Sequence, residues 1–442
     1  MRTRLTGWGR TAGSFAQLDA PATEEAIAAA LRAPAVIARG LGRSYGDAAQ
    51  VGGGLVLDNA GLNAIGPIGP DGLVTLGAGV SIEDLLTGAI PQGWFVPVTP
   101  GTRQVSIGGA VAADVHGKNH HVDGSFARHV RAMRLVTPTG VHALSPEVEP
   151  ALFWATFGAM GLTGVVSEVT LQLLAIASDQ VLVDTDRYDD LDEVMAAMVE
   201  GDDRYRYSVA WVDCMARGRR MGRSILTRGD HASAPAGDDP TNHAPRAARL
   251  AVPITAPPGL LNPATITAFN ELWFRAAPRH RVGEAQSIGS FFHPLDGLRD
   301  WNRLYGPRGF VQYQFAVPDD AAETVTTAIA RLSASRVPSF LAVLKRFGPG
   351  DPAPLSFPQP GWTLALDLPV GPARLAALLD ELDELVIAAR GRVYLAKDSR
   401  LSPQHVRAMY PRLGEFAALA DTIDPERHLT SDLARRLRLR EG

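Results

Sequence analysis

Lysine is scarce in this chain of 442 residues, so the few positions where it occurs are informative. The sequence holds 43 lysines and arginines, but only Lys118, Lys345 and Lys397 are lysine. Arginine stays protonated, whereas a lysine that is buried or lies beside another cation can lose its proton. Such a side chain can offset developing negative charge or act as a base. We expect these lysines to serve an anionic substrate; the alternative is that they are surface residues, with Lys397 paired to Asp398 or Glu415.

Two glycine-rich segments could hold the phosphate groups of a nucleotide. They are ARGLGRSYGD at 38–47 and PGTRQVSIGGAVAADVHG at 100–117. Glycine permits positive φ and lets backbone N–H groups approach an anion without a Cβ in the way. Neither the Rossmann spacing G-x-G-x-x-G nor a P-loop motif is present, which argues against both sites. The first segment alone is typical of a plain turn, but the pair suggests a dinucleotide held between two subdomains.

Histidines cluster next to the second glycine segment. His116, His120 and His121 lie in HGKNHH, with His129 close by. Adjacent histidines rarely ligate one ion and no H-E-x-x-H motif occurs, so we expect no metal and assign His116 to position a substrate hydroxyl. The single cysteine, Cys214, excludes an intrachain disulfide and a cysteine-rich zinc site, and we expect it to be a buried small hydrophobe.

The elements that must position these residues alternate between strand and helix. Early in the chain, strands are predicted at 35–40, 54–59 and 73–80, and helices at 21–33 and 81–90. Short strands alternating with helices and separated by glycine turns indicate a mixed α/β domain.

After about residue 175 the pattern changes to longer strands and amphipathic helices. The segment 229–263 is rich in Pro, Ala, Asp and Asn without periodicity, which is typical of a mobile loop or lid. We therefore expect an α+β protein of two domains: residues 1–175 completed by 391–442, and a substrate domain at 176–390. The elements predicted in this part are a strand and helix within 181–199, strands at 205–213, 308–318, 339–348 and 361–370, and helices at 319–332 and 372–391.

Composition excludes several classes of protein. With 46% hydrophobic and 20% charged residues the chain is ordinary globular protein, not a disordered, collagen-like or coiled-coil one. A net charge of −4 argues against a generally basic nucleic-acid-binding protein. No run of about eighteen uncharged apolar residues predicts a transmembrane helix, and the N-terminus lacks the apolar run of a secretory signal. We expect a cytoplasmic protein, with peripheral membrane contact left open.

The chain resembles the FAD-dependent vanillyl-alcohol-oxidase (p-cresol-methylhydroxylase, PCMH) superfamily over nearly its whole length. This resemblance implies a PCMH-type FAD-binding domain and a substrate domain built on an antiparallel sheet. Some members bind the flavin covalently through a histidine, but Arg43 occupies that place here, so we expect dissociable FAD. The segments that carry the resemblance are RGLGRSYGD, PGTRQVSIGG, HGKNHH, LFWATFGAMGLTG, WNRLYG, QYQF, LKRFGPG, PLSFP, YLAKDSR and SDLARRL.

The resemblance also assigns the residues that contact the cofactor. Those expected at the pyrophosphate and adenosine are Arg39, Gly40, Leu41, Gly42, Arg43, Ser44, Tyr45, Gly46, Gly101, Ser106, Ile107, Gly108 and Gly109. Those expected along the flavin are Ala113, Asp114, Val115, His116, Val166 and Tyr394.

Within the superfamily the chain is most similar to actinobacterial members that oxidise a pentose carried on polyprenyl phosphate. The implied reaction moves a hydride from the ribose C2 carbon to the flavin while a base takes the hydroxyl proton. Lys397 is expected nearest the reacting centre, with His116 orienting the hydroxyl. The residues expected to contact the substrate are Tyr45, Lys118, Arg303, Gln312, Gln314, Lys345, Thr363 and Ala365.

The same resemblance implies a pathway and leaves alternatives open. A separate nicotinamide-dependent keto-reductase would complete the epimerisation that yields the arabinose donor for cell-wall arabinan. The cell-envelope placement of the family stays open beside the cytoplasmic expectation. The alternatives are an aldonolactone or alditol oxidase of the same fold, and a flavin-free sugar-phosphate binding protein.

Two positions depart from the family pattern. Members sensitive to covalent nitroaromatic inhibitors carry a cysteine where this chain has Ala365, and an asparagine where it has Thr363. Alanine offers no thiolate, so we expect insensitivity to such inhibitors.

Overall fold

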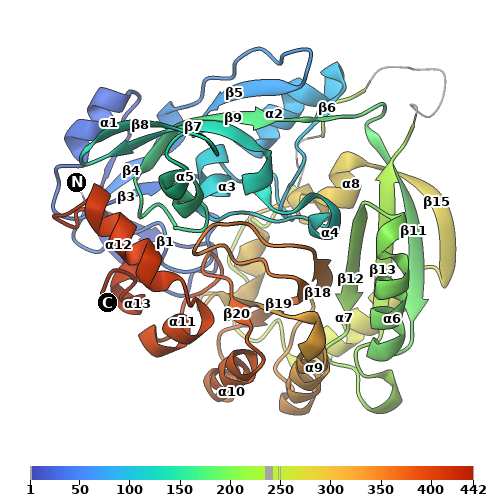
Figure 1. Cartoon of the computed structure of the whole chain (residues 1–442). Coiled ribbons are helices and arrows are strands. Elements are labelled where there is room, and N and C mark those ends of the chain that lie inside the picture. Colours follow the sequence, from blue (N-terminus) through green and yellow to red (C-terminus); the bar gives the residue numbers. More distant parts are fainter. Residues whose placement is uncertain (1, 234–241, 247, 249, 442) are drawn as a thin grey trace.

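Three sheets organise the molecule in the computed structural model, which describes residues 2–233, 242–246, 248 and 250–441 (Figure 1). The first part of the chain forms two four-stranded sheets, and the middle part forms an eight-stranded sheet. The C-terminal helices return to the first part (Figure 1).

The first sheet has the order β1-β2-β4-β3. Its parallel strands β3 and β4 occupy the predicted segments 35–40 and 54–59, whereas β1 and β2 were not predicted. Helix α1 begins where the hydroxyl of Thr23 accepts a hydrogen bond from the Ala26 N–H, as expected for an N-cap. The bounds are β1 (Arg2–Thr6), β2 (Gly13–Asp19), α1 (Glu24–Ala30), β3 (Val36–Arg39) and β4 (Leu55–Asp58).

The second sheet is antiparallel, in the order β5-β9-β7-β8. Helix α3 packs against β5 and β9, and this contact brings the second glycine segment to the sheet. The bounds are β5 (Leu73–Gly77), α2 (Ile82–Ala89), β6 (Trp94–Phe95), α3 (Ile107–Ala112), α4 (His120–Asp123), β7 (Val130–Thr137), β8 (Gly140–Leu144), α5 (Pro150–Thr156), β9 (Val165–Gln172) and β10 (Leu174–Ala175).

The eight-stranded sheet has the order β15-β11-β13-β12-β18-β19-β17-β20 and is antiparallel throughout. Helices α9 and α10 cover one face near β17, where the hydroxyl of Tyr313 donates to Asp383 of α10. The bounds are β11 (Gln180–Tyr188), α6 (Leu191–Gly201), β12 (Tyr207–Val212), β13 (Ser224–His231), β15 (His280–Ser287), β17 (Phe310–Val317), α9 (Glu323–Ser335), β18 (Ala342–Phe347), β19 (Gly361–Pro369), α10 (Leu375–Ala388) and β20 (Arg392–Val393).

The predicted loop 229–263 contains more regular structure than its composition indicates. Its first residues end strand β13, because Gly229 pairs with β11 on one side and β12 on the other. Strand β14 (Leu250–Ala251) pairs with β16 (Leu298–Arg299), and helices α7 (Pro263–Ala276) and α8 (Ile288–Phe292) follow. Residues 234–241, 247 and 249 lie outside the described residues, so mobility of this segment stays a prediction.

The C-terminal segment joins both parts of the molecule. Strand β20 pairs with β17, so the first residues after 391 complete the eight-stranded sheet. Helix α11 (Pro403–Met409) then packs against α10 and β20, while α12 (Leu413–Ile423) and α13 (Asp432–Leu437) lie against the first part. Arg436 of α13 holds this arrangement, with its guanidinium 2.7 Å from Asp47 and 2.9 Å from Asp398.

Candidate active site

The two glycine segments meet each other in space. A Cβ on Gly40 would lie only 2.0 Å from the Ser106 hydroxyl oxygen, so any other residue here would displace that hydroxyl. Ser106 caps α3 by accepting a hydrogen bond from Gly109 N–H at 3.2 Å. The Gly108 N–H donates to the carbonyl oxygen of Ala78 at 2.8 Å and anchors the segment to the second sheet.

The segment YLAKDSR lies against the other side of the first glycine loop. The Tyr45 N–H donates to the Ala396 carbonyl oxygen at 2.9 Å, and a Cβ on Gly46 would lie 1.9 Å from the Asp398 carbonyl oxygen. The Lys397 ammonium consequently lies 4.0 Å from the centre of the Tyr45 ring. Three segments far apart in the sequence therefore form one continuous wall.

Arginines of the first glycine loop have two different roles. Arg39 donates to the carbonyl oxygens of Thr6 and Ala49, and so fixes the shape of the loop. The Arg43 guanidinium lies 3.9 Å from the Trp8 ring centre, and its Nε is buried without a hydrogen-bond partner among the described residues. A buried donor that lacks a partner, in a cradle that only glycine fits, agrees with a bound phosphate. The predicted FAD loops therefore suit the cofactor.

The residues predicted along the flavin form a buried wall. The Tyr394 hydroxyl donates to the Ala113 carbonyl oxygen at 2.7 Å. The Asp114 carboxylate accepts hydrogen bonds from the Ser125 and Ser356 hydroxyls at 2.5 Å, so its side chain stabilises the wall from within. Burial raises the pKa of Asp114 to about 7. Val115 and Val166 are also buried.

His116 is held in one orientation at the junction of the two parts. Its Nε2 lies 2.9 Å from the Gln314 side-chain nitrogen, which also donates to the Thr363 hydroxyl. An amide nitrogen only donates, so Nε2 accepts and the ring carries its proton on Nδ1. No described residue is a partner for Nδ1. Burial and nearby cations, Lys345 first, lower the pKa of His116 well below its usual value, so the ring stays neutral.

One face of the eight-stranded sheet carries most of the predicted substrate residues. Side chains two apart share a face, and Gln314 lies opposite Ala365 as Lys345 lies opposite Thr363. The hydrogen bond from Gln314 to His116 shows that this face meets the first part of the chain. The predicted residues that it brings together are Gln312, Gln314, Lys345, Thr363 and Ala365.

All three lysines converge on this junction. Burial and the positive charge of Lys345 lower the pKa of Lys118 to about 7, and burial lowers that of Lys345 to about 8. The same two causes lower the pKa of Lys397, while Asp367 raises it. The charge of Lys345 therefore acts on both of the other lysines, and Asp398 and Glu415 pair instead with Arg436 and Arg412.

The structure gives Arg303 contacts that the sequence did not indicate, and it places Asp367, which the sequence analysis did not select, at the site. Arg303 donates to the carbonyl oxygens of Val252 and Pro253 and so anchors the segment after β14; its contact with substrate stays a prediction. Asp367 was not predicted, yet it is almost fully buried on β19, on the same face as Ala365. Its only sequence signal is its position two residues beyond Ala365 in a strand that has no other charged residue.

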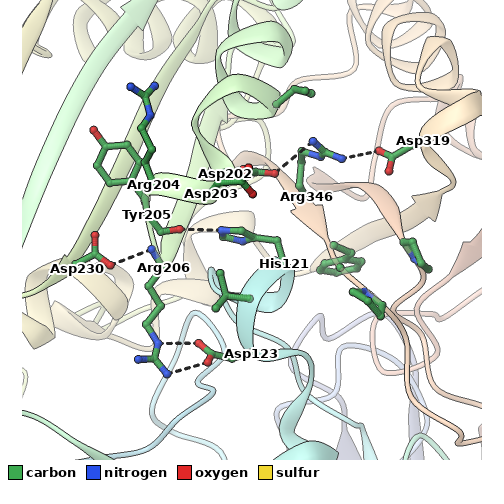
Figure 2. A pocket seen from close by; sticks show the side chains of 16 residues that line it. His121, Asp123, Asp202, Asp203, Arg204, Tyr205, Arg206, Asp230, Asp319 and Arg346 are labelled. Atoms are coloured by element: carbon green, nitrogen blue, oxygen red, sulfur yellow. Dashed lines mark hydrogen bonds and ion pairs between the residues drawn. The ribbon is translucent and has the colours of Figure 1, made fainter.

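A separate crevice of about 980 Å³ lies on the far side of Phe347, whose ring contacts the predicted catalytic histidine (Figure 2). Its charged side chains pair with one another: Arg206 with Asp123, and Arg346 with Asp202. None of the predicted site residues lines this crevice. The crevice lies between α4 and the eight-stranded sheet and is separate from the lysine site.

Comparisons with known proteins agree with this geometry. The family described as "FAD binding domain" matches residues 15–144. The decaprenylphosphoryl-β-D-ribose oxidase of Mycolicibacterium smegmatis is 43% identical over 99% of this chain and 97% of its own length. The chain belongs to the decaprenylphosphoryl-β-D-ribose oxidase family. This confirms the predicted superfamily and the α+β fold of a two-domain flavoprotein.

Two other relatives also match most of this chain. An uncharacterised Streptomyces coelicolor protein, named for the mprA 5′ region, is 42% identical over 81% of this chain and all of its own length. The L-gulono-1,4-lactone dehydrogenase of Mycobacterium tuberculosis is 25% identical over 92% of this chain. As a member of the decaprenylphosphoryl-β-D-ribose oxidase family, the chain is an FAD-dependent oxidoreductase.

Proposed function

We propose that this protein oxidises the C2 hydroxyl of decaprenylphosphoryl-β-D-ribose, or a similar polyprenyl-phosphoryl pentose, to the keto sugar. The observation that carries the proposal is the convergence of all three lysines of the chain on one junction, beside His116 and the glycine loops. Buried ammonium groups attract an anionic sugar phosphate and offset the negative charge that develops during oxidation. A soluble neutral sugar would not require them.

The residues of the chain divide the work of the reaction. Bound FAD supplies the hydride acceptor. The Nδ1–H of His116 donates to a sugar oxygen and fixes its orientation, because Gln314 occupies the other ring nitrogen. Lys397 offsets the negative charge that develops as the hydroxyl proton leaves, or accepts that proton itself, while Lys118 and Lys345 bind the phosphate. Tyr45 packs beside the reacting sugar.

The decisive experiment mixes the yellow holoenzyme anaerobically with decaprenylphosphoryl ribose and follows flavin absorbance. Bleaching at a rate that matches turnover supports the proposal. L-Gulono-1,4-lactone is the matched control substrate; bleaching by the lactone and not by the lipid-linked ribose would favour an aldonolactone oxidase. A colourless purified protein that binds no added FAD would favour a sugar-phosphate binding protein.

We further propose that FAD is bound without a covalent bond, because Arg43 stacks on Trp8 where covalent relatives carry histidine. Acid precipitation should leave the chromophore in the supernatant. A flavin-sized mass increment on the denatured chain would refute this.

A stripe of exposed apolar side chains supports contact with a lipid surface. Phe269, Leu272 and Trp273 lie three and four residues apart on α7, and all three are exposed. Leu250 and Ile254 add to the exposed apolar surface of the preceding segment. In the part of the chain that the structure describes, none of the helices has the length and hydropathy to cross a bilayer. Contact would therefore be peripheral.

The apolar stripe is connected to the active site by packed aromatic rings. Phe269 contacts Phe340, Phe340 contacts Tyr305, and Tyr305 stacks on Phe310, which contacts Tyr45. A polyprenyl chain that leaves the sugar site along this path would reach the bilayer. Leu272→Glu should weaken co-sedimentation of the protein with anionic phospholipid vesicles. Val148→Glu is the control: it introduces the same charge at an exposed apolar residue of the first part and should not weaken co-sedimentation. Equal binding by both variants would refute the surface.

The remaining partner and boundary assignments belong to the same proposal. The keto product requires reduction, so a nicotinamide-dependent keto-reductase would complete epimerisation to the arabinose donor. We place the FAD-binding domain at 1–175 with 391–442, and the substrate domain at 176–390; the shared strand β20 supports a boundary a few residues later.

A further inference from the structure

A serine hydroxyl that lies between two buried carboxyl groups has only one hydrogen to offer them. The Oγ of Ser125 lies 2.5 Å from Oδ1 of Asp114 and 2.6 Å from Oδ2 of Asp351. Asp114 is fully buried, and the Asp351 side chain is 2% exposed. Because a hydroxyl donates only once, one of the two contacts needs a proton on the carboxyl group. Two ionised carboxylates that share this hydroxyl would repel each other in a poorly solvated place.

The partners of the two carboxyl groups decide which one holds the extra proton. Arg128 forms an ion pair with Asp351 at 2.8 Å, and this pair stabilises the ionised form of Asp351. Apart from the shared serine, the described groups that donate to Asp114 are uncharged: the Ser356 hydroxyl at 2.5 Å and the Ala127 N–H at 3.3 Å. The geometry therefore places the extra proton on Asp114.

We propose that Asp114 is a protonated carboxylic acid that donates to Ser125, and that this acid–serine–carboxylate bridge positions His116. The proposal rests on the proposed role of His116 in orienting the sugar hydroxyl. With the proton in place, the contact between Asp114 and Ser125 runs from the acid to the hydroxyl, and Ser125 gives its own hydrogen to Asp351. The Ser356 hydroxyl still donates to the second oxygen of Asp114, so each donor of the bridge has an acceptor.

The bridge connects the main chain of His116 to the segment between β18 and β19. Ser125 pairs with His116 through an isolated β-bridge, so the residue that receives the proton also fixes the histidine backbone. Asp351 lies in the segment between β18 and β19, as does Phe357, whose ring centre is 5.4 Å from that of His116. Loss of the bridge would therefore move His116 relative to the sheet face that carries Gln314.

The groups that face Asp114 agree with a neutral acid. Burial and then the charge of Asp351 raise the pKa of Asp114 to about 7, against its hydrogen-bond donors. Arg128 acts on Asp114 only through Asp351. The Tyr394 hydroxyl, which follows β20, stays neutral because burial raises its pKa, and it donates to Ala113. Asp114 is therefore protonated below about pH 7, and above it two charges meet at one hydroxyl and the bridge opens.

Infrared difference spectra of the FAD-loaded enzyme test the proton without any substrate. Asp114→Asn should remove a protonated-carboxyl band that titrates near pH 7. Asparagine suits this position because the backbone here has φ of 43°, in the left-handed region that asparagine tolerates. A difference spectrum between about pH 5 and pH 9 that is identical in the variant and the unmodified enzyme would overturn the proposal.

A second variant covers the case in which Asp114→Asn does not fold. Asp351→Asn removes the neighbouring charge, so the midpoint of the Asp114 band should fall by about one pH unit, a tenfold loss of proton affinity. An unchanged midpoint would overturn the proposal. The matched control is Asp424→Asn, because Asp424 is also fully buried but pairs with Arg440. It should leave the band unchanged; a fall equal to that of Asp351→Asn would mean general loosening of the fold and would overturn the assignment.

The pH dependence of the reaction tests the positioning role. The rate of anaerobic flavin reduction by decaprenylphosphoryl ribose is measured for Asp114→Asn, which cannot ionise, and for the unmodified enzyme. The ratio of the first rate to the second should rise by up to about tenfold between pH 6 and 8, as the acid of the unmodified enzyme ionises. Titration of the lysines affects both enzymes and cancels in the ratio, so a ratio that does not change with pH would overturn the positioning role. If the ribose reduces the flavin of neither enzyme, the proposed function fails and the infrared result stands.

Discussion

Replacement of Lys397 by alanine tests the central assignment of the site. The ammonium is half-buried, lies 4.0 Å from the Tyr45 ring centre, and is the one lysine that interacts with the first glycine loop. Burial lowers its pKa, which indicates a poorly solvated position where a charge acts strongly on its neighbours. The side chain projects from a turn whose backbone bonds do not involve its ammonium, so alanine should not disturb the fold.

The expected loss follows from charges that act mainly in the transition state. Removal of one preorganised donor typically lowers kcat by 10²–10³-fold, and Lys345 leaves a second positive charge in the site. We therefore expect the lower end, ~10²-fold in kcat or about 2.7 kcal/mol in the activation free energy. The assay is anaerobic flavin reduction by decaprenylphosphoryl ribose, together with FAD content from absorbance. Arg331→Ala, which removes an exposed arginine paired with Glu381, is the control and should leave the rate unchanged.

The conservative variant separates the two roles of the amine. Lys397→Arg keeps the charge but cannot deprotonate, so retained activity indicates charge stabilisation, and lost activity indicates proton transfer or strict geometry. Full turnover by Lys397→Ala with an intact flavin spectrum would remove the catalytic assignment altogether.

Three further predictions test the surrounding structure. Arg436→Met should lower the free energy of unfolding in urea by about 3 kcal/mol, because two largely buried carboxylates lose their partner; a loss no larger than that of exposed Arg435→Met would contradict this. Ala365→Cys should gain a covalent adduct during turnover with nitroaromatic inhibitors, whereas the unmodified chain should gain none. Cys214 is fully buried and burial raises the pKa of its thiol, so an adduct on Cys214 would refute the predicted position of Ala365 in the substrate site. Burial lowers the pKa of His293 to about 3, so between pH 6.5 and 3 this histidine is protonated in the unfolded chain but not in the folded one. The free energy of unfolding therefore falls as the pH falls, by about 1.4 kcal/mol per pH unit for this group. Thermal melting of His293→Gln should therefore depend less on pH in that window; an equal dependence would contradict the assignment.

Local chemistry made much of the fold predictable. The strands at 310–317 and 361–369 match their predicted segments because they are mostly apolar runs buried on both faces. The helix at 375–388 matches its segment because its apolar residues recur on one buried face. The glycine segments were informative for a different reason: Gly46 lies so close to the Asp398 carbonyl that no other residue fits, and a Cβ on Gly40 would displace the Ser106 hydroxyl.

Other features were hidden because they depend on distant partners. Helix α7 follows a proline-rich stretch and carries apolar residues on both its exposed and its buried faces, so its periodicity did not indicate burial. Arg303 matches a family motif, but the segment that folds back after β14 supplies carbonyl acceptors for its guanidinium. Asp367 is an ordinary aspartate in a strand until register places it beside Gln312 and the chain brings Tyr305 against it.

The placement of Lys397 and Asp367 explains why the site needs both parts of the molecule. Lys397 is held by the first glycine loop through the bond between Tyr45 and Ala396, whereas Asp367 is held by the eight-stranded sheet. Neither part alone therefore contains both the partly buried lysine and the buried carboxylate. His116 repeats this division, since it follows the second glycine segment but is oriented by Gln314 of the sheet. A displacement between the parts would therefore separate His116 from Gln314 and move Lys397 relative to the sheet face that carries Lys345.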